Sequence, residues 1–396
     1  MNPYRPGAGR RPPLLAGREP LLDTFDVVCR RIEAFGEGDR SWVLNGLRGV
    51  GKTALLAVLL DRVSTSGWIT ATVEAGSTDS LAVSLSQALV RSLRTATGRH
   101  PQPRLRRLLG VFKAFSVKVD PSGSVSLGIE IDAIHGVADS GRLGPDLASL
   151  LEVLGETARD LGVGVLLLVD ELQEATAAEL AAVNTAVHRI GQSTPQLPVI
   201  FVGAGLPSLP AQLAEATSYA ERLYDYRPVG LLDPDAARDA LVVPAERLDV
   251  AWEPDGLAAA LAAAGGYPYF LQSIGKHVWD LAIGAPITAA DVTVGLVAAR
   301  REVDDGLYRS RWERATPAQR QLLRALAAAG AGAPAAISDV ATAMGESRRG
   351  TPRKTSDLSV AREELIKKGL LYSPERGLLA FTVPGMDDFI TRQPDP

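Results

Sequence analysis

The feature that most constrains this 396-residue chain is a glycine-rich loop between an apolar strand and an apolar helix. Trp42, Val43 and Leu44 precede the loop, and residues 53–63 follow it with helical periodicity. The loop matches the phosphate-binding pattern G-x-x-x-x-G-K-[ST], so it predicts an α/β fold with a parallel sheet. A chance glycine turn is the alternative, which both flanks disfavour. The loop reads Gly46-Leu47-Arg48-Gly49-Val50-Gly51-Lys52-Thr53.

Each fixed position of this pattern has a chemical reason. The glycines let successive backbone N–H groups point at phosphate oxygens, and the following helix adds the positive end of its dipole. Lys52 would reach the β- and γ-phosphates and take part in catalysis, while the Thr53 hydroxyl would bind magnesium. Residues 46–53, together with Ala54, are therefore predicted to bind ATP with Mg²⁺.

A second motif follows the apolar run at residues 163–169, which has the length of a buried strand. Asp170 and Glu171 come directly after it. In a phosphate-loop protein, a carboxylate at this position holds magnesium through its water shell, and a second carboxylate polarises the attacking water. We predict these roles for Asp170 and Glu171. The alternative is that Asp170 caps the next helix and that Glu171 is solvated.

The chain divides into four predicted parts. Residues 1–20 form an extended arm, because Pro3, Pro6, Pro12 and Pro13 interrupt regular helix. Residues 21–230 form the α/β phosphate-loop domain, with a β-hairpin inserted near residues 115–132, where Phe115 begins an alternating apolar pattern. Residues 231–312 form an all-α lid. Residues 313–396 form a winged helix, in which three helices are followed by two short strands.

The composition excludes several classes of protein. A formal charge of −4 gives no global signature of nucleic-acid binding, so any such site must be local. Cys29 is the single cysteine, which excludes a disulfide framework within the chain and fits a reducing compartment. Residues 1–20 lack the apolar stretch of a signal peptide, and the run at 163–169 is too short to span a bilayer. We expect a cytoplasmic protein.

These motifs resemble the AAA+ class of ATPases, particularly the replication-initiator group related to Orc1 and Cdc6. The chain is most similar to bacterial AAA ATPases of that kind, and it has features of the signal-transducing STAND NTPases. Residues 15–19 and 265–272 carry the resemblance beside the two nucleotide motifs. The resemblance implies that Gly17, Arg18 and Glu19 lie against adenine. Alternatively, Arg18 and Glu19 merely begin a helix.

Two departures from the family pattern bear on hydrolysis. The strand at residues 198–202 should end in a polar residue that senses the γ-phosphate, but glycine and alanine follow Val202. Near the point where relatives place a lid arginine, this chain has Gly266-Tyr267-Pro268. That arrangement resembles the STAND group, in which the proline packs beside the nucleotide, although a simple helix start also explains Pro268. We therefore expect slow or regulated hydrolysis.

Arg222 occupies the position at which relatives place an arginine finger, which acts on a neighbouring subunit's nucleotide. An exposed arginine at a helix end is the alternative interpretation. An arginine finger would require a homo-oligomer whose assembly depends on nucleotide.

The C-terminal unit raises the question of DNA. Residues 356–368 would be the recognition helix, and residues 373–377 the wing. Between residues 345 and 380, eight Lys and Arg face five Asp and Glu, a local charge of +3 that favours phosphate contacts. However, the helix itself carries Asp357, Glu363 and Glu364, and residues 345–355 read equally well as a flexible basic loop. Winged helices also dock proteins or autoinhibit, so a STAND-like signalling ATPase is the alternative to a DNA-binding switch.

Overall fold

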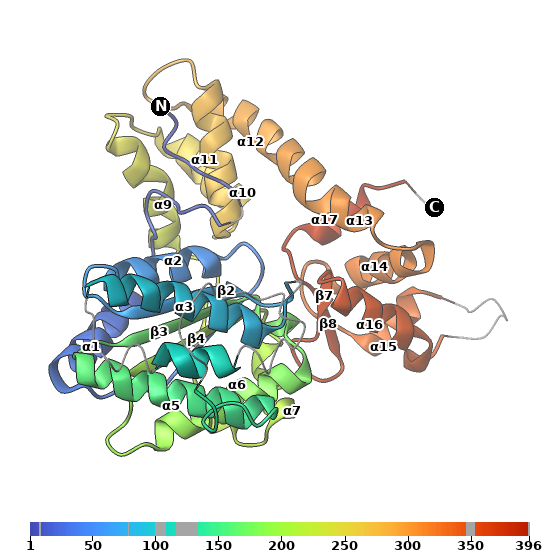
Figure 1. Ribbon diagram of the computed structural model, residues 1–396. Helices are drawn as coiled ribbons and strands as arrows, with labels where there is room; N and C mark the ends of the chain where they lie inside the picture. Colours follow the sequence, from blue (N-terminus) through green and yellow to red (C-terminus); the bar gives the residue numbers. More distant parts are fainter. Residues whose placement is uncertain (8, 78, 100–107, 116–133, 346–352, 395–396) are drawn as a thin grey trace.

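The structure is a computed structural model that describes residues 1–7, 9–77, 79–99, 108–115, 134–345 and 353–394. An α/β domain forms the base of the molecule in Figure 1. Four lid helices stand over one side of it, and the C-terminal unit packs at the other side (Figure 1). The N-terminus lies beside the lid helices rather than beside α1 (Glu19–Phe35), although α1 follows it directly in the sequence (Figure 1).

A five-stranded sheet organises the base, and every described pairing in it is parallel. This confirms the predicted α/β fold with a parallel sheet. The strand order is β2-β3-β4-β1-β5, so the strand before the phosphate loop lies between β4 and β5. The strands are β1 (Trp42–Asn45), β2 (Ile69–Glu74), β3 (Val165–Asp170), β4 (Val199–Gly205) and β5 (Asp225–Pro228).

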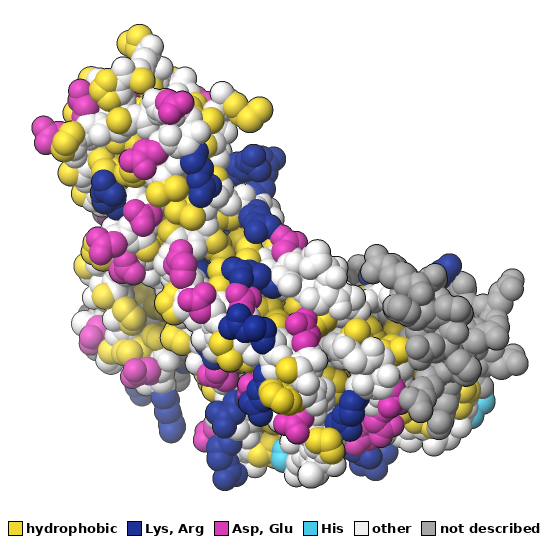
Figure 2. All heavy atoms as spheres, turned by 90° about the vertical axis from the view of Figure 1, so that its left-hand side faces the viewer, with side chains coloured by type: hydrophobic (Ala, Val, Ile, Leu, Met, Phe, Trp, Pro, Cys, Tyr) yellow, Lys and Arg dark blue, Asp and Glu magenta, His cyan; other side chains and the backbone are white. Residues whose placement is uncertain are grey.

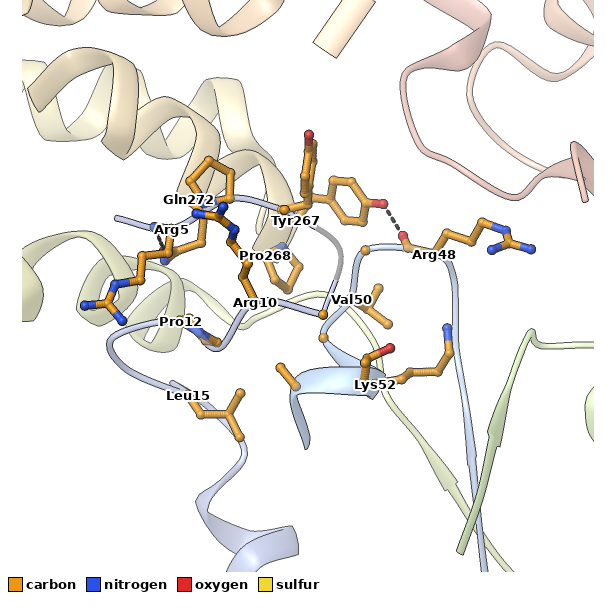
Figure 3. Close-up of a pocket in the computed structure, with 18 of the residues that line it drawn as sticks. Arg5, Arg10, Pro12, Leu15, Arg48, Val50, Lys52, Tyr267, Pro268 and Gln272 are labelled. Carbon is orange, nitrogen blue, oxygen red and sulfur yellow. Dashed lines mark hydrogen bonds between the residues drawn. The ribbon is translucent and has the colours of Figure 1, made fainter. Parts of the chain in front are cut away.

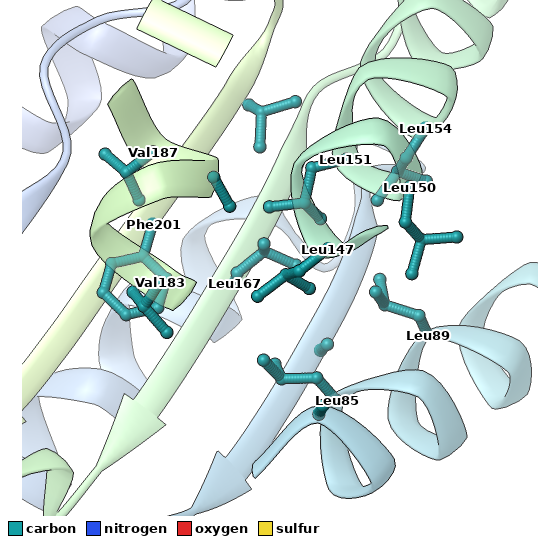
Figure 4. Close-up of a cluster of buried hydrophobic side chains, with 14 of the residues drawn as sticks. Leu85, Leu89, Leu147, Leu150, Leu151, Leu154, Leu167, Val183, Val187 and Phe201 are labelled. Atoms are coloured by element: carbon teal, nitrogen blue, oxygen red, sulfur yellow. The ribbon is translucent and has the colours of Figure 1, made fainter. Parts of the chain in front are cut away.

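Helices cover both faces of the sheet, which explains the continuous apolar run of β3. Leu167 and Val169 face one core cluster with α3, α5 and α6, while Leu166 and Leu168 face another with α1 and α2. Figure 4 shows Leu167 and Phe201 of the sheet packed beneath side chains of α3, α5 and α6. The covering helices are α2 (Lys52–Val63), α3 (Leu81–Arg99), α5 (Leu143–Leu161) and α6 (Ala177–Gln192).

One predicted element is partly wrong. Residues 108–115 are helical, so Phe115 lies in a helix instead of beginning a hairpin strand. Phe112 and Phe115 are both fully buried in the core beside α3, and this packing overrides the local alternation of apolar residues. The remainder of the predicted hairpin lies outside the described residues. Sequence reasoning also missed three short elements between β3 and β5: η1 (Leu172–Glu174), α7 (Leu209–Ala216) and α8 (Ala220–Leu223).

The lid consists of helices, as predicted, and the N-terminal arm packs against it. Tyr4 is buried in the lid core, and its hydroxyl donates to the Leu241 carbonyl oxygen at 2.5 Å. Gly275 makes room for the Tyr4 ring, since a Cβ there would lie 2.6 Å from a ring carbon. The extended arm is therefore anchored. The lid helices are α9 (Pro234–Glu246), α10 (Pro254–Ala264), α11 (Pro268–Leu281) and α12 (Ala289–Val303).

The C-terminal unit has a core of its own around Leu322, Leu326 and Phe389. That core also takes in Tyr308 and Trp312, which precede the predicted unit. A three-stranded antiparallel sheet, β6-β8-β7, lies beside the helices. Two elements, η2 (Asp304–Arg309) and α13 (Ser310–Glu313), precede the unit. Its own elements are α14 (Pro317–Gly330), β6 (Ala335–Ala336), α15 (Ile337–Ala343), η3 (Thr355–Leu358), α16 (Ser359–Lys367), β7 (Leu371–Tyr372), β8 (Leu378–Phe381) and α17 (Met386–Thr391).

In the described part of the chain, no helix combines the length and the apolarity that a membrane span requires.

Candidate nucleotide site

The phosphate loop lies between the carboxyl end of β1 and the first turn of α2, as its sequence predicts. Gly49 and Gly51 adopt φ values of 79° and 95°, which side-chain-bearing residues rarely adopt. A Cβ on Gly46 would collide with the Val229 carbonyl, so the loop needs glycine there for space. These glycines allow the sharp backbone turn that a bound phosphate requires.

Lys52 is buried at the floor of the loop. Its ammonium donates to the carbonyl oxygens of Gly46 and Leu47, both at 2.8 Å. Burial lowers the pKa of Lys52 to about 8, against the opposing effect of Glu171 and Asp170. A bound phosphate would stabilise the charged form, so binding and protonation of Lys52 must be linked.

Thr53 and Asp170 are brought together by the fold. The Thr53 hydroxyl donates to Asp170 Oδ2 at 2.5 Å, and Asp170 Oδ1 accepts from the Glu171 backbone N–H at 2.9 Å. A hydroxyl and a carboxylate at the sheet edge are the protein groups that hold magnesium in phosphate-loop proteins, where phosphates and water supply the other ligands. The pair therefore fits a magnesium ion.

Protein contacts hold the Glu171 side chain, which is not free in solvent. Its side chain is only 22% exposed and accepts from Arg48 Nη1 at 3.3 Å and from Gln173 Nε2 at 2.5 Å. Its backbone has a φ of 48°, a left-handed conformation that is strained for glutamate. Strained backbone of this kind is concentrated at functional sites. These contacts favour a functional position over the solvated interpretation.

Gln173 is a site residue that sequence reasoning missed. Its Oε1 accepts from the Leu206 backbone N–H at 3.0 Å, just after the end of β4. A Cβ on Gly205 would lie 2.6 Å from that same oxygen, so the glycine at the end of β4 makes room for Gln173. An amide from η1 therefore lies where a polar residue of β4 was expected. No sequence pattern signals this, because it depends on the packing of β3 against β4.

A cavity of about 380 Å³ opens above the phosphate loop, within the size range of small-ligand sites. Residues 48–54 and Glu171 form the floor of this cavity. Its roof comes from three segments: side chains of the arm between Arg5 and Arg18, side chains at the start of α11 such as Pro268 and Gln272, and Leu307 with Arg311. Figure 3 shows Arg10, Leu15 and Pro268 around the cavity with Val50 and Lys52.

The roof touches the phosphate loop directly at Arg48. The Tyr267 hydroxyl donates to the Arg48 carbonyl oxygen (Figure 3), and burial raises the pKa of that hydroxyl. From the C-terminal unit, the Thr382 carbonyl accepts from the Arg48 backbone N–H at 3.3 Å. Gly369 lets the Arg48 guanidinium approach, since a Cβ there would lie 3.0 Å from Nη2. All three parts of the molecule thus meet at one loop residue.

Only some of the other predicted nucleotide-binding residues line the cavity. Arg18 lines it and donates to the carbonyl oxygens of Val50 and Gly230, at 3.3 and 2.5 Å. Pro268 lines it at the first turn of α11. Gly17 does not line it; a Cβ there would instead lie 2.7 Å from Ala236 of the lid. Adenine contact by Arg18 and Pro268 stays a prediction.

Arg222 lies at the other edge of the sheet. It lines a separate cavity with His188 and Tyr219, whose rings pack in a tilted arrangement with centroids 4.6 Å apart. The parallel pairing of Trp42 with Asp225 places α8 near the amino ends of the strands, opposite the phosphate loop. Arg222 is therefore remote from this chain's own nucleotide site, and action on a neighbour stays a prediction.

Residues 14–202 match the family model described as "AAA ATPase domain". This part of the chain is an AAA ATPase domain. Residues 305–390 match a domain of unknown function, DUF8462. No curated protein matches the chain.

Solved structures extend the likeness to the rest of the chain. A Walker-type ATPase of Pyrococcus abyssi is 17% identical with a TM-score of 0.58, and the match covers 98% of each chain. The Orc2 protein of Aeropyrum pernix, solved in complexes with ADPNP and ADP, is 14% identical with a TM-score of 0.56, and the match covers 97% of this chain and 96% of that one. The predicted resemblance to Orc1/Cdc6-like AAA+ ATPases is confirmed at the level of domain and fold.

Proposed function

We propose that this AAA ATPase domain binds ATP with magnesium, hydrolyses it slowly, and uses the bound nucleotide as a conformational switch. The observation that carries the proposal is the pairing of Glu171 with Arg48 and Gln173. A carboxylate that polarises water must accept a proton from it, and the two donors weaken Glu171 as a base, so withdrawal of one of them would favour this step. Hydrolysis would then depend on a rearrangement of the loop.

Magnesium would bind at Thr53 and Asp170 and neutralise charge on the β- and γ-phosphates. Lys52 would move from the carbonyls of Gly46 and Leu47 toward the phosphates. The phosphates would attract the Arg48 guanidinium more strongly than the Glu171 carboxylate does. Arg48 would then release Glu171. The lid and the C-terminal unit both touch Arg48, so its movement would reach both of them.

The test compares the wild-type chain with Glu171→Gln. We expect the variant to bind ATP with unchanged affinity by calorimetry but to lose at least about 100-fold in single-turnover hydrolysis, the usual range for loss of a general base. Glu174→Gln is the matched control, because Glu174 is a nearby carboxylate that lies farther from the Arg48 guanidinium, at 3.7 Å. Turnover at the wild-type rate in Glu171→Gln would contradict the proposed role of Glu171.

We also propose that the C-terminal unit is a winged helix that contacts duplex DNA. Lys354, Lys367 and Arg376 are exposed on it. Glu364 accepts from Gln319 Nε2 at 2.5 Å, so one acidic side chain of α16 is engaged by α14. On the face in Figure 2, the described basic side chains are interspersed with acidic ones over the α/β domain and lid. The C-terminal unit, with its local charge of +3 between residues 345 and 380, is our candidate for a DNA surface.

A gel-shift titration tests DNA binding. Changing Arg353 and Lys354 to alanine should weaken duplex binding and reduce its salt dependence, because phosphate contacts release counterions. The matched control changes Arg300 and Arg301, two exposed arginines of α12, and removes the same charge from the lid. An equal loss in both pairs would show only non-specific charge attraction, and no binding at low salt would reject DNA contact.

A specific contact favours the second candidate, a STAND-like signalling ATPase with an autoinhibitory C-terminal unit. Thr382 and Gly369 of that unit contact Arg48 of the phosphate loop. The ATPase rate and the oligomeric state, each measured with and without duplex DNA, distinguish the two candidates. Stimulation by DNA supports the first. Nucleotide-dependent assembly without any DNA effect supports the second and would give Arg222 a target.

A further inference from the structure

Arg311 lies at the cavity although no sequence motif points to it. It belongs to α13, which follows the π-helical segment η2 at the end of α12. Leu307 and Arg311 line the cavity together with Arg48 and Lys52 of the floor. Wide turns of the π type are often retained at functional sites. Here the wide turn precedes a cation that lines the nucleotide cavity.

Only some of the N–H groups of the Arg311 guanidinium have hydrogen-bond partners. Nη1 donates to the Leu307 carbonyl oxygen at 2.8 Å, while Nε is buried and has no hydrogen-bond partner in the described structure. Burial lowers the pKa of Arg311, and the nearby Arg48 and Arg314 lower it further. Within the described residues, no carboxylate forms an ion pair with it. A partly buried cation in this state is stabilised by an incoming anion.

The residues that line the cavity indicate that this anion is a phosphate. Around Arg311 the described lining holds Arg48 and Lys52 but, among acidic residues, only Glu171. Glu171 is already engaged by Arg48 and Gln173. The floor is built for a polyphosphate, whose terminal group carries the most negative charge. A guanidinium beside Arg48 matches such an oxygen-rich group through its fixed fork of N–H donors.

The segment that carries Arg311 is tied to the C-terminal unit. Tyr308 and Trp312, on either side of it, belong to that unit's core. The Tyr308 hydroxyl donates to the Pro384 carbonyl oxygen at 2.6 Å, and Arg392 donates to both carboxylate oxygens of Asp304 at 2.6 and 2.9 Å. When Arg311 is displaced, the C-terminal unit therefore moves with it.

We propose that Arg311 contacts the terminal phosphate of the bound nucleoside triphosphate and so couples the C-terminal unit to the presence of that phosphate. The proposal rests on the proposed ATP-binding function. It assigns to a residue beyond α12 the phosphate contact that the lid segment Gly266-Tyr267-Pro268 does not supply.

The experiment compares affinities for a non-hydrolysable ATP analogue and for ADP, by calorimetry on the full-length chain. Arg311→Gln should weaken binding of the analogue by about tenfold or more, because a charge-assisted contact to the terminal phosphate is lost, and should leave ADP affinity within about twofold. Arg311→Lys should fall between. Arg309→Gln is the matched control, since Arg309 lies on the same segment but is exposed and paired with Asp305 at 2.9 Å.

An equal loss for both nucleotides, or no loss for the analogue, would overturn the contact with the terminal phosphate. If the wild-type chain binds neither nucleotide, the proposed function itself fails, which is a separate outcome. A thermal melt by circular dichroism identifies a folding defect in Arg311→Gln, and Arg311→Lys then carries the test.

Small-angle scattering tests the coupling. The radius of gyration of the wild-type chain should differ between its analogue-bound and ADP-bound forms, and the difference should vanish in Arg311→Gln but persist in Arg309→Gln. A wild-type chain with identical scattering in both states, or an undiminished difference in Arg311→Gln, would overturn the coupling.

Discussion

The floor and the roof of the cavity are built in different ways. The floor is a contiguous loop after β1 plus the carboxylate of Glu171 after β3, both at the carboxyl edge of one parallel sheet in which β4 lies between these two strands. The roof is assembled from the arm, the lid and the segment before the C-terminal unit, which are far apart in the sequence. A contiguous floor with a composite roof lets one ligand bring several separate parts together, the usual basis of a nucleotide switch.

The largest expected effect comes from the floor. Lys52→Ala should lower ATP affinity by more than about 100-fold, because it removes the buried cation from the phosphate loop. Calorimetric titration with ATP measures the loss. Lys367→Ala, which removes one exposed charge from α16, should leave affinity unchanged. Unchanged affinity in Lys52→Ala would mean that nucleotide binds elsewhere, and the distinction between floor and roof would collapse.

Gln173→Ala addresses catalysis within the floor without removing a charge. We expect turnover to fall by about tenfold, because Glu171 loses a donor that positions it, while ATP affinity stays within about twofold. Steady-state hydrolysis and a binding titration separate the two effects. Gln192→Ala, at the exposed end of α6, is the control. A faster Gln173→Ala enzyme would instead identify Gln173 as a restraint on Glu171.

The pH dependence of binding sharpens the role of Lys52. Its pKa of about 8 in the free protein lies below the ordinary value for lysine, so above pH 8 the free side chain is increasingly neutral. Phosphate binds the charged form, and binding above pH 8 must therefore take up a proton. ATP affinity should fall by about tenfold between about pH 7 and pH 9. Affinity that stays flat across this range would exclude the lowered pKa.

The smallest expected effect comes from the roof. Tyr4→Ala should detach the arm, because it removes the buried ring that fits against Gly275. Trypsin should then cleave near Arg10 more readily, and ATP affinity should fall by about threefold, as expected for loss of part of the cover. Tyr4→Phe keeps the ring and serves as the control. An affinity loss as large as that of Lys52→Ala would show that the roof contributes as much as the floor.

Much of the floor follows from sequence because its chemistry is local. The glycine spacing of the phosphate loop dictates the positive φ values of Gly49 and Gly51, and the apolar run of β3 delivers Asp170 and Glu171 to the same sheet edge. Phe115 shows the limit of such reasoning. Alternation there suggested a strand, but burial of the ring among α3 and its neighbours decided for helix.

The sequence by itself determined the parallel α/β sheet, the phosphate loop and the pair of carboxylates beside it. Only the tertiary structure decided that Gln173 fills the space left by Gly205, that Tyr4 anchors the arm on the lid, and that Arg311 reaches the cavity. The physical reason is the range of the interactions. Backbone conformation and strand burial are set by neighbouring residues, whereas these three contacts require surfaces that come together only when the domains pack.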